Sequence, residues 1–232
     1  MTIQNVQVEG SSGVSESLVE SKVRDDLSGK YWRFISRANS LFYPGQKIET
    51  DILNSFPSVE NVSVSRPDFH TLLIEVSERK PIALWCEGNT VSVPPQDTPC
   101  FLMDKDGLIF AKAPSTLPEG FLYYFGGEMK EGNPIGQTFL DGEKIQNLSF
   151  FLGLLPRLHL KPVALLADPN DELELYVEGG LKILLRSDMS YDVALQNFES
   201  LWNDPALGWA QKGIPSTLQY IDLRFDNKVF YK

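Results

Sequence analysis

The stretch ENVSVSRPDFHTLLIEVSE, residues 60–78, contains two runs of alternating apolar and polar side chains around a central turn. Val62 and Val64 are the apolar positions before the turn, which has the sequence Arg-Pro-Asp at residues 66–68. After the turn, the alternating apolar positions are Leu72, Ile74 and Val76. A period of two is typical of strands that bury one face, so this stretch predicts a β-hairpin.

One strand and two amphipathic helices are predicted before this hairpin. Residues 3–8 place Val6 and Val8 on one face of a short strand. Apolar residues then recur at helical spacing in two stripes: Leu18, Val19, Val23 and Leu27, and Ile48, Ile52, Leu53 and Phe56. Three short strands bury one face only, so both helices are expected to cover that face and to leave a strand edge exposed. The aromatic and basic connection at residues 31–42 is expected to pack its aromatic side chains.

From residue 80 onward, the pattern indicates a β-rich region with two helices. Short strands are predicted at residues 82–85, 101–103 and 108–110, and an irregular loop rich in glycine and proline at residues 114–136. The two apolar stripes at helical spacing are Ile145, Leu148, Phe151, Leu152 and Leu155, and Tyr191, Leu195, Phe198 and Trp202.

Two hairpins are predicted in the C-terminal part of the chain. The first spans residues 173–185 and turns at Glu178-Gly179-Gly180. The second joins residues 218–225 to residues 228–231 through Asp226-Asn227. In its first strand, Ile221, Leu223 and Phe225 are expected to share one face, and Asp222 and Arg224 the other. The whole chain is therefore expected to have an α+β fold.

Charge and hydropathy restrict the classes of partner. The 232 residues include 31 acidic and 21 basic side chains, which gives a net charge of -10 and a pI of about 4.7. An acidic surface argues against nucleic acid or an anionic membrane face as the partner. The longest apolar stretches, such as residues 148–155, are much shorter than the ~20 residues of a spanning helix, and no secretory leader pattern opens the chain.

Residues suited to catalysis or metal binding are few. Neither His70 nor His159 lies in a metal-ligand spacing, and nucleophile-elbow and phosphate-loop motifs are absent from the sequence. Asp168, Asn170 and Glu172 crowd oxygen atoms into one loop, as a calcium site would, but the pattern lacks the ligands that complete an EF-hand loop. The sequence therefore predicts no enzyme, no cofactor and no metal.

Cys86 and Cys100 are too few for a disulfide-rich scaffold and too isolated for a zinc site. They could close a loop between neighbouring strands, which would stabilise the protein by about 3 kcal/mol in the chain-entropy model. Two buried free thiols are the alternative, and the spacing alone leaves both open.

Three segments together carry a family resemblance: residues 56–67 leading into 73–85, the run LMDKDGLIF at residues 102–110, and the ending YIDLRFDNKV at residues 220–229. In this order they resemble the extracytoplasmic part of the bacterial cell-division proteins FtsQ and DivIB. The resemblance implies a POTRA domain over residues 1–79 and an FtsQ/DivIB-type β domain over residues 80–232. The ending is the specific part, because the first segment alone indicates only a POTRA protein.

Proteins of this family are non-enzymatic scaffolds of the divisome that bind FtsB/DivIC and FtsL and help to regulate septal peptidoglycan synthesis. The resemblance implies a single-pass protein of the cytoplasmic membrane, with this region on the extracytoplasmic side at the septum and its membrane helix outside this chain. That placement favours the Cys86–Cys100 bridge, since such compartments permit disulfides. The alternative is the POTRA-bearing periplasmic region of an outer-membrane assembly or secretion component, for which further POTRA copies would be expected.

By the same resemblance, the partner contact maps to the last two strands. The matching residues are Arg224, Phe225, Asp226, Asn227, Lys228, Val229, Phe230 and Tyr231. A strand at a sheet edge offers unpaired backbone groups to which a partner segment can add. Phe225 or Tyr231 would serve as aromatic anchors and Arg224 as an ion-pair donor. The alternative is that Phe225 belongs to the core and Arg224 is an ordinary surface charge.

Overall fold

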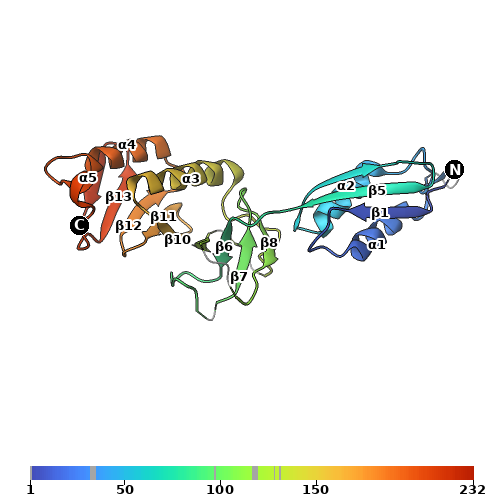
Figure 1. The fold of residues 1–232 in the computed structure, drawn as a ribbon, viewed down its shortest axis with the longest axis horizontal. Helices are drawn as coiled ribbons and strands as arrows, with labels where there is room; N and C mark the ends of the chain where they lie inside the picture. The colour runs from blue at the N-terminus through green and yellow to red at the C-terminus, as the bar shows by residue number, and fades with distance from the viewer. Residues whose placement is uncertain (1, 32–34, 97, 117–119, 128, 131) are drawn as a thin grey trace. The chain divides into compact units, whose positions relative to one another are not determined.

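The computed structural model describes residues 2–31, 35–96, 98–116, 120–127, 129–130 and 132–232. It divides into two compact units, Met1–Lys80 and Pro81–Lys232, and the boundary expected from the sequence falls after residue 79. Both units combine helices with a sheet, so the chain is a mixed α+β protein (Figure 1). None of the helices within the described residues has both the length and the apolar character required to cross a bilayer.

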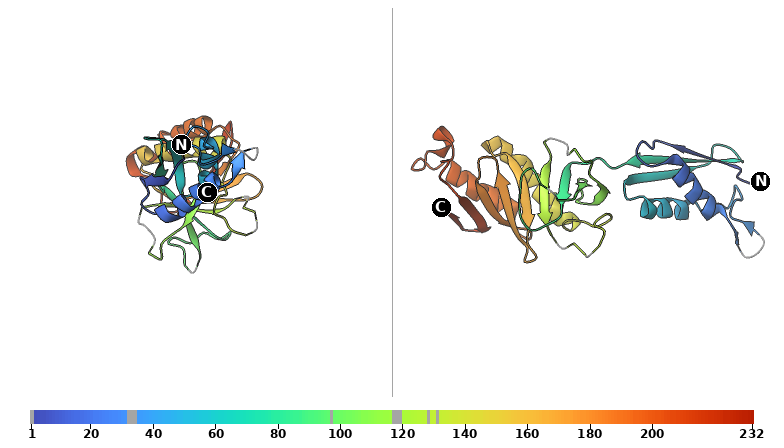
Figure 2. Two further views of the ribbon diagram at one scale, coloured as in Figure 1. Left: turned by 90° about the vertical axis from the view of Figure 1, so that its right-hand side faces the viewer. Right: turned by 90° about the horizontal axis from the view of Figure 1, so that it is seen from below.

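The first unit is a three-stranded sheet with two helices on one face. Its elements are β1 (Asn5–Glu9), α1 (Glu16–Leu27), β2 (Lys30–Tyr31), β3 (Ile35–Ser36), α2 (Gly45–Ser55), β4 (Val59–Ser65) and β5 (Thr71–Glu78). Strand β5 lies in the middle, parallel to β1 and antiparallel to β4. Figure 2 shows α1 and α2 on the same side of this sheet. The predicted hairpin and both predicted helices are present.

The core of this unit follows the two apolar stripes. Val19 and Val23 from α1 and Ile48 and Ile52 from α2 are fully buried against Ile74 of the sheet. The connection between the helices differs from the prediction, because Leu41 and Phe42 are 63% and 58% exposed. Trp32 and Phe34, two of the aromatic residues in that prediction, lie outside the described residues.

The second unit contains one large sheet. Its strands are β6 (Ala83–Cys86), β7 (Cys100–Met103), β8 (Ile109–Lys112), β9 (Leu122–Gly126), β10 (Pro162–Ala167), β11 (Glu172–Val177), β12 (Lys182–Arg186), β13 (Tyr220–Phe225) and β14 (Lys228–Tyr231). In the described part of the chain the strand order is β14-β13-β12-β11-β10-β9-β6-β7-β8. The helices are α3 (Gly142–Leu154), the 3₁₀ turn η1 (Leu155–Leu158), α4 (Tyr191–Trp202) and the short α5 (Trp209–Lys212).

Two central strands differ from the sequence prediction. Strand β9 lies within residues 114–136, which predicted an irregular loop, and β10 follows η1. They pair parallel to each other and join the N-terminal strands of the sheet to the C-terminal ones. Both faces of these strands are covered: Tyr124 and Leu165 belong to the main core, whereas Phe125 and Ala164 belong to a second cluster. A strand buried on both faces shows no alternation, which is why the pattern failed here.

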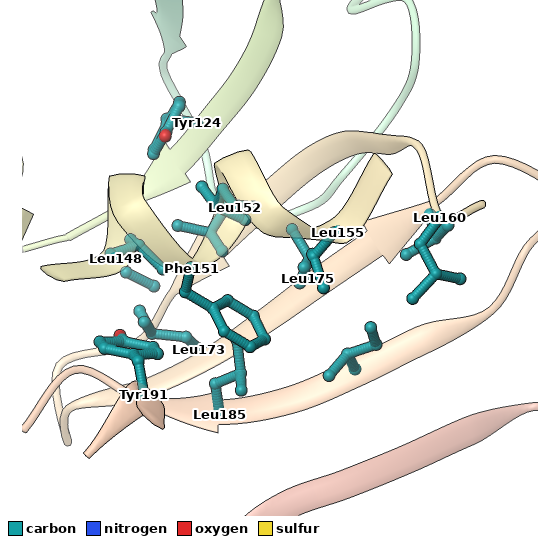
Figure 3. Packing of buried hydrophobic residues seen from close by; sticks show 14 of the residues in the cluster. Tyr124, Leu148, Phe151, Leu152, Leu155, Leu160, Leu173, Leu175, Leu185 and Tyr191 are labelled. Atoms are coloured by element: carbon teal, nitrogen blue, oxygen red, sulfur yellow. The ribbon is translucent and has the colours of Figure 1, made fainter. Parts of the chain in front are cut away.

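Helices α3 and α4 cover one face of the C-terminal half of the sheet (Figure 1). Leu148, Phe151 and Leu152 of α3 and Leu155 of η1 point toward the sheet, where Leu173, Leu175 and Leu185 meet them (Figure 3). Asp141 begins α3 by accepting the backbone N–H of Lys144 at 3.1 Å, a typical N-cap. This packing holds the C-terminal strands in a fixed position.

Cys86 and Cys100 form a disulfide between the paired strands β6 and β7. Their Cα atoms lie 4.1 Å apart at directly opposed positions of the ladder. Both side chains are buried in the second cluster, beside Leu84 and Phe125. Of the two alternatives left by the spacing, the structure has the bridge.

Candidate protein-docking edge

Strand β14 forms one end of the large sheet and pairs with β13 only. Tyr231 lies opposite Ile221 and Phe230 lies opposite Asp222. At the end of the ladder, the N–H of Lys232 donates to the carbonyl of Tyr220 at 3.2 Å. Throughout the chain as described, no strand pairs with the other side of β14. This outer side is the exposed edge that the sequence predicted.

The backbone groups on the outer side can be assigned from the register. In an antiparallel ladder, hydrogen-bonded pairs alternate with pairs that make no hydrogen bond to each other. Because Lys232 bonds to Tyr220, the next bonded pair is Phe230 with Asp222. The N–H and C=O groups of Tyr231 and Val229 therefore point away from β13. Within the residues that the structure describes, no strand pairs with this side of β14, so these four groups have no ladder partner.

A β-bulge places Phe225 differently from the prediction. The β13–β14 register shifts between Asp222 and Phe225, so β13 carries an extra residue there. Ile221 and Leu223 are fully buried, but Phe225 is 46% exposed and does not share their environment. A bulge interrupts the alternation of faces, and strict alternation was the basis of the prediction. Phe225 is therefore a surface aromatic rather than a core residue.

The exposed Phe225 has an aromatic partner on β14. Phe230 is 50% exposed, and its ring meets that of Phe225 edge to face, with centroids 5.4 Å apart. Aromatic residues that become buried near the centre of a protein interface are typical anchors of binding. The two rings form an apolar site directly beside the free edge.

Tyr231 and Val229 face the helices. The Tyr231 ring packs edge to face on buried Trp209 of α5, with centroids 5.7 Å apart, and it remains 46% exposed. Val229 lines a shallow groove of about 250 Å³ between β14 and α4, together with Asn197, Leu201 and Asp204. The edge thus has the Phe225–Phe230 pair toward one face, and the Tyr231–Trp209 pair and the groove toward the other.

Arg224 is held by internal ion pairs. Its guanidinium donates to both carboxylate oxygens of Asp222 at 2.9 and 2.7 Å and to Glu172 of β11 at 2.8 Å. The Asp222 side chain is almost completely buried, and the hydrogen bonds that Arg224 donates to this carboxylate raise the pKa of Arg224 above its usual value. The ion-pair donor expected for the partner is thus occupied within the sheet. Its structural role is to neutralise a buried carboxylate.

The turn of the hairpin is fastened to α4. The side-chain amide of Asn197 donates to the backbone carbonyl of Asp226 at 3.0 Å. Asp226, Asn227 and Lys228 are themselves exposed. The edge strand is therefore positioned at both ends, by Asn197 at the turn and by the Lys232–Tyr220 hydrogen bond at the other end.

Polar side chains of β11 and β12 also bind one another, beside the ion pairs of Arg224. Glu174 accepts hydrogen bonds from the Tyr176 hydroxyl at 2.7 Å and from Lys182 at 3.1 Å. Burial acts to raise the pKa of Glu174, but these two hydrogen bonds outweigh it and the pKa is lowered. The hydrogen bond to Glu174 raises the pKa of Lys182 in turn. Both groups are ionised at neutral pH and act as a structural pair.

The residues considered for chemistry serve local structure. The Asp168 carboxylate accepts the backbone N–H groups of Asn170 at 2.7 Å and Glu172 at 3.2 Å, which closes its own turn. His70 lies exposed in the β4–β5 turn, and His159 ends η1 in the left-handed conformation. Within the described residues, no three histidine, cysteine or carboxylate side chains are grouped so as to hold a metal ion.

Two cavities of the second unit were not foreseen from the sequence. One of about 280 Å³ is lined mainly by apolar residues, with His159 and Trp202 among them. The other, of about 250 Å³, contains Asp168, Lys144 and Asp171. In the second, Asp171 accepts hydrogen bonds from Lys144 and Ser187, which lower the pKa of Asp171. An ionised carboxylate bound to a cation and a hydroxyl is poorly suited to act as a general acid at neutral pH.

No protein-family model matches the chain, and no curated protein sequence is significantly similar to it.

Proposed function

We propose that this chain is the extracytoplasmic part of an FtsQ/DivIB-type cell-division protein. In this proposal it is a non-enzymatic scaffold that binds FtsB/DivIC and FtsL-type partners and helps to regulate septal peptidoglycan synthesis. The free outer side of β14 is the observation that carries the proposal, because the residues that resemble the family's ending form this edge.

Binding would occur by strand addition. An extended partner segment would hydrogen-bond to the outward N–H and C=O groups of Val229 and Tyr231. Each such hydrogen bond contributes only about 0.5–1.5 kcal/mol net, so side chains must add to the affinity. Alternate partner residues would meet the Phe225–Phe230 pair on one face and the groove beside α4 on the other.

The first unit is compatible with the same family. Its main elements follow the order β1, α1, α2, β4, β5, with both helices on one face of the sheet. A POTRA domain is expected to have this order, and the short β2–β3 pair is an addition to it. We therefore propose that residues 1–79 are a POTRA domain.

The Cys86–Cys100 disulfide supports the proposed compartment. Disulfides persist in the periplasm and outside the cell, whereas cytosolic thiols are kept reduced. A buried bridge between two strands fits a domain that folds on the extracytoplasmic side of the membrane at the septum.

A calorimetric titration with the extracytoplasmic segment of FtsB/DivIC tests the proposal. Val229→Pro removes an outward N–H group but no hydrogen bond to β13, so the fold should persist while affinity falls at least tenfold. Val229→Ala is the matched control, because it keeps the N–H group and should change affinity less than threefold. Circular dichroism would establish that both variants are folded.

Two results would contradict the proposal in different ways. Equal affinity of Val229→Pro and the unmodified chain would exclude strand addition at β14. Absence of binding by the unmodified chain would exclude the partner assignment itself.

A further inference from the structure

A basic and apolar surface lies at one end of the first unit, and the proposed function does not use it. We define the basic loop surface by six residues: Lys30, Arg37, Leu41, Phe42, Arg66 and Phe69. The first four belong to the connection between α1 and α2, and the last two to the β4–β5 turn. Residues 29–44 contain three basic and no acidic side chains, in a chain whose net charge is -10.

The two segments are adjacent in space. The N–H of Ile3 donates to the carbonyl of Ala38 at 2.8 Å, and the N–H of Gln4 donates to the carbonyl of His70 at 2.8 Å. The consecutive residues Ile3 and Gln4 thus hydrogen-bond to the α1–α2 connection and to the β4–β5 turn, respectively. Both loops lie at the end of the unit where β1 and β5 begin in parallel. The six side chains therefore belong to one end of the unit.

The apolar members of this surface are unusually exposed. Leu41 and Phe42 are consecutive and 63% and 58% exposed, and Phe69 is 45% exposed. They project from loops, and the cavities found in the described part of the chain are not lined by them. Protruding apolar side chains suit insertion into a soft apolar phase better than reception of an anchor from another protein.

The cations of this surface form no ion pair within the described residues. Lys22, Arg24 and Lys47 of the same unit all form ion pairs with carboxylates. By contrast, Lys30, Arg37 and Arg66 form none with any described residue. Nε of Arg37 and Nη1 of Arg66 are buried and have no hydrogen-bond partner there, so only the remaining guanidinium nitrogens of these two half-buried side chains can face a ligand. These guanidinium groups lie over aromatic rings, Arg37 over Tyr31 at 5.4 Å and Arg66 over Phe69 at 4.9 Å.

The net charge of the chain does not prevent binding to an anionic surface at this end. The Debye length at physiological ionic strength is about 8 Å, so charges elsewhere on the molecule are largely screened. Asp68 is the one acidic residue in the two segments. Its carboxylate accepts the backbone N–H groups of His70 and Thr71. The two loops therefore carry more basic than acidic side chains.

We propose that the basic loop surface binds the headgroup region of an anionic lipid bilayer. Leu41 and Phe42 would enter the boundary between headgroups and acyl chains, and Lys30, Arg37 and Arg66 would contact lipid phosphates. Each basic residue near such a surface strengthens binding by about fivefold. The inference does not depend on the strand-addition proposal, because it concerns the other unit of the chain.

Sedimentation of the full chain with lipid vesicles tests the inference. The chain should bind vesicles containing equal phosphatidylglycerol and phosphatidylcholine, and at least tenfold more weakly to pure phosphatidylcholine or at high salt. The double variant Leu41→Ser/Phe42→Ser should weaken binding at least tenfold, and Lys30→Glu at least fivefold. Phe150→Ser and Lys161→Glu are matched controls at exposed positions of the second unit, and they should bind like the unmodified chain.

Three outcomes would overturn the inference. The first is no sedimentation with anionic vesicles. The second is equal loss of binding in the loop variants and the controls. The third is binding to soluble polyglutamate as tight as binding to the vesicles, which would assign the surface to an acidic protein segment.

Discussion

Phe225 and Phe230 meet edge to face across the β13–β14 hairpin, and each keeps about half of its side chain in contact with solvent. Aromatic rings in this arrangement are already oriented, so a partner would lose little side-chain entropy in packing against them. The bulge after Asp222 is the reason that Phe225 reaches this position. The apolar part of the proposed interface is therefore preformed in the free protein.

The first prediction concerns these two rings. Phe230→Ala should weaken binding of the FtsB/DivIC segment by about 10- to 100-fold, within the range of interface anchors. Because the side chain is half exposed, the free energy of unfolding should fall by less than about 1 kcal/mol. Phe150→Ala, at a residue that is 61% exposed on α3, is the matched control and should leave the affinity unchanged. A Phe230→Ala variant with full affinity would remove the ring pair from the interface.

The second prediction concerns Arg224, which should act in stability more than in partner binding. Arg224→Met should reduce the free energy of unfolding by about 2–4 kcal/mol, because it leaves the buried Asp222 carboxylate without its cation. Urea denaturation would measure this loss. In the double variant Asp222→Asn/Arg224→Met much of the loss should be recovered, and additive effects of the two changes would contradict the assignment.

The third prediction concerns the disulfide. The unfolded, unreduced protein should show no titratable thiol, because both cysteines are paired. The variant Cys86→Ala/Cys100→Ala should lose about 3 kcal/mol of stability, as expected for a bridge that closes a loop of this length. Urea denaturation with and without a reductant would measure the loss. The reductant should destabilise the unmodified chain and leave the double variant unaffected.

The fourth prediction is a pH dependence located at Glu78. Its carboxylate accepts the backbone N–H groups of Val14, Gly13 and Ser12 at 3.0, 2.7 and 2.7 Å. These hydrogen bonds, of which that from Val14 has the largest effect, lower the pKa of Glu78 to about 2. A lowered pKa in the folded state means that the ionised form stabilises the fold. This stability is complete above the ordinary pKa of 4.5 and is lost as the pH falls toward 2.

Glu78→Gln should therefore lower the free energy of unfolding by about 1.5 kcal/mol at neutral pH, the lower end of the range for hydrogen bonds to a charged group. The difference from the unmodified chain should shrink below pH 4.5 and vanish near pH 2. Melting temperatures measured across this range would follow it. Glu75→Gln is the control on the same strand. Among the described residues this carboxylate accepts a hydrogen bond from Ser63 alone, so the effect should be smaller.

Alternating and helical patterns predicted the elements that bury one face. The β4–β5 hairpin, the helices α1 to α4 and the β11–β12 hairpin all lie where such patterns occur. Strands β9 and β10 could not be found in this way, because each is buried on both faces and shows no alternation. Phe125 of β9 lies in the second cluster, and Leu165 of β10 lies in the main core. A loop composition of glycine and proline around β9 added to the error.

The candidate edge was only partly predictable. The hairpin and its turn at Asp226-Asn227 follow from local sequence, but a bulge depends on pairing with another strand and leaves no clear local signal. One of the two partners of Arg224 was likewise hidden, because Glu172 lies 52 residues away in sequence, whereas Asp222 was expected on the same face. The exposure of Phe225 and the internal role of Arg224 are both consequences of tertiary contacts.

The fastening of the hairpin to α4 has a mechanical consequence. Asn197 holds the turn, and the Lys232–Tyr220 hydrogen bond holds the opposite end of β14. A tensile load applied along this strand would be shared by its backbone hydrogen bonds together, in shear, and would pass into the helix as well. Peeling the strand away from one end would instead break the bonds one after another, so the direction of pull would decide how much force the hairpin withstands.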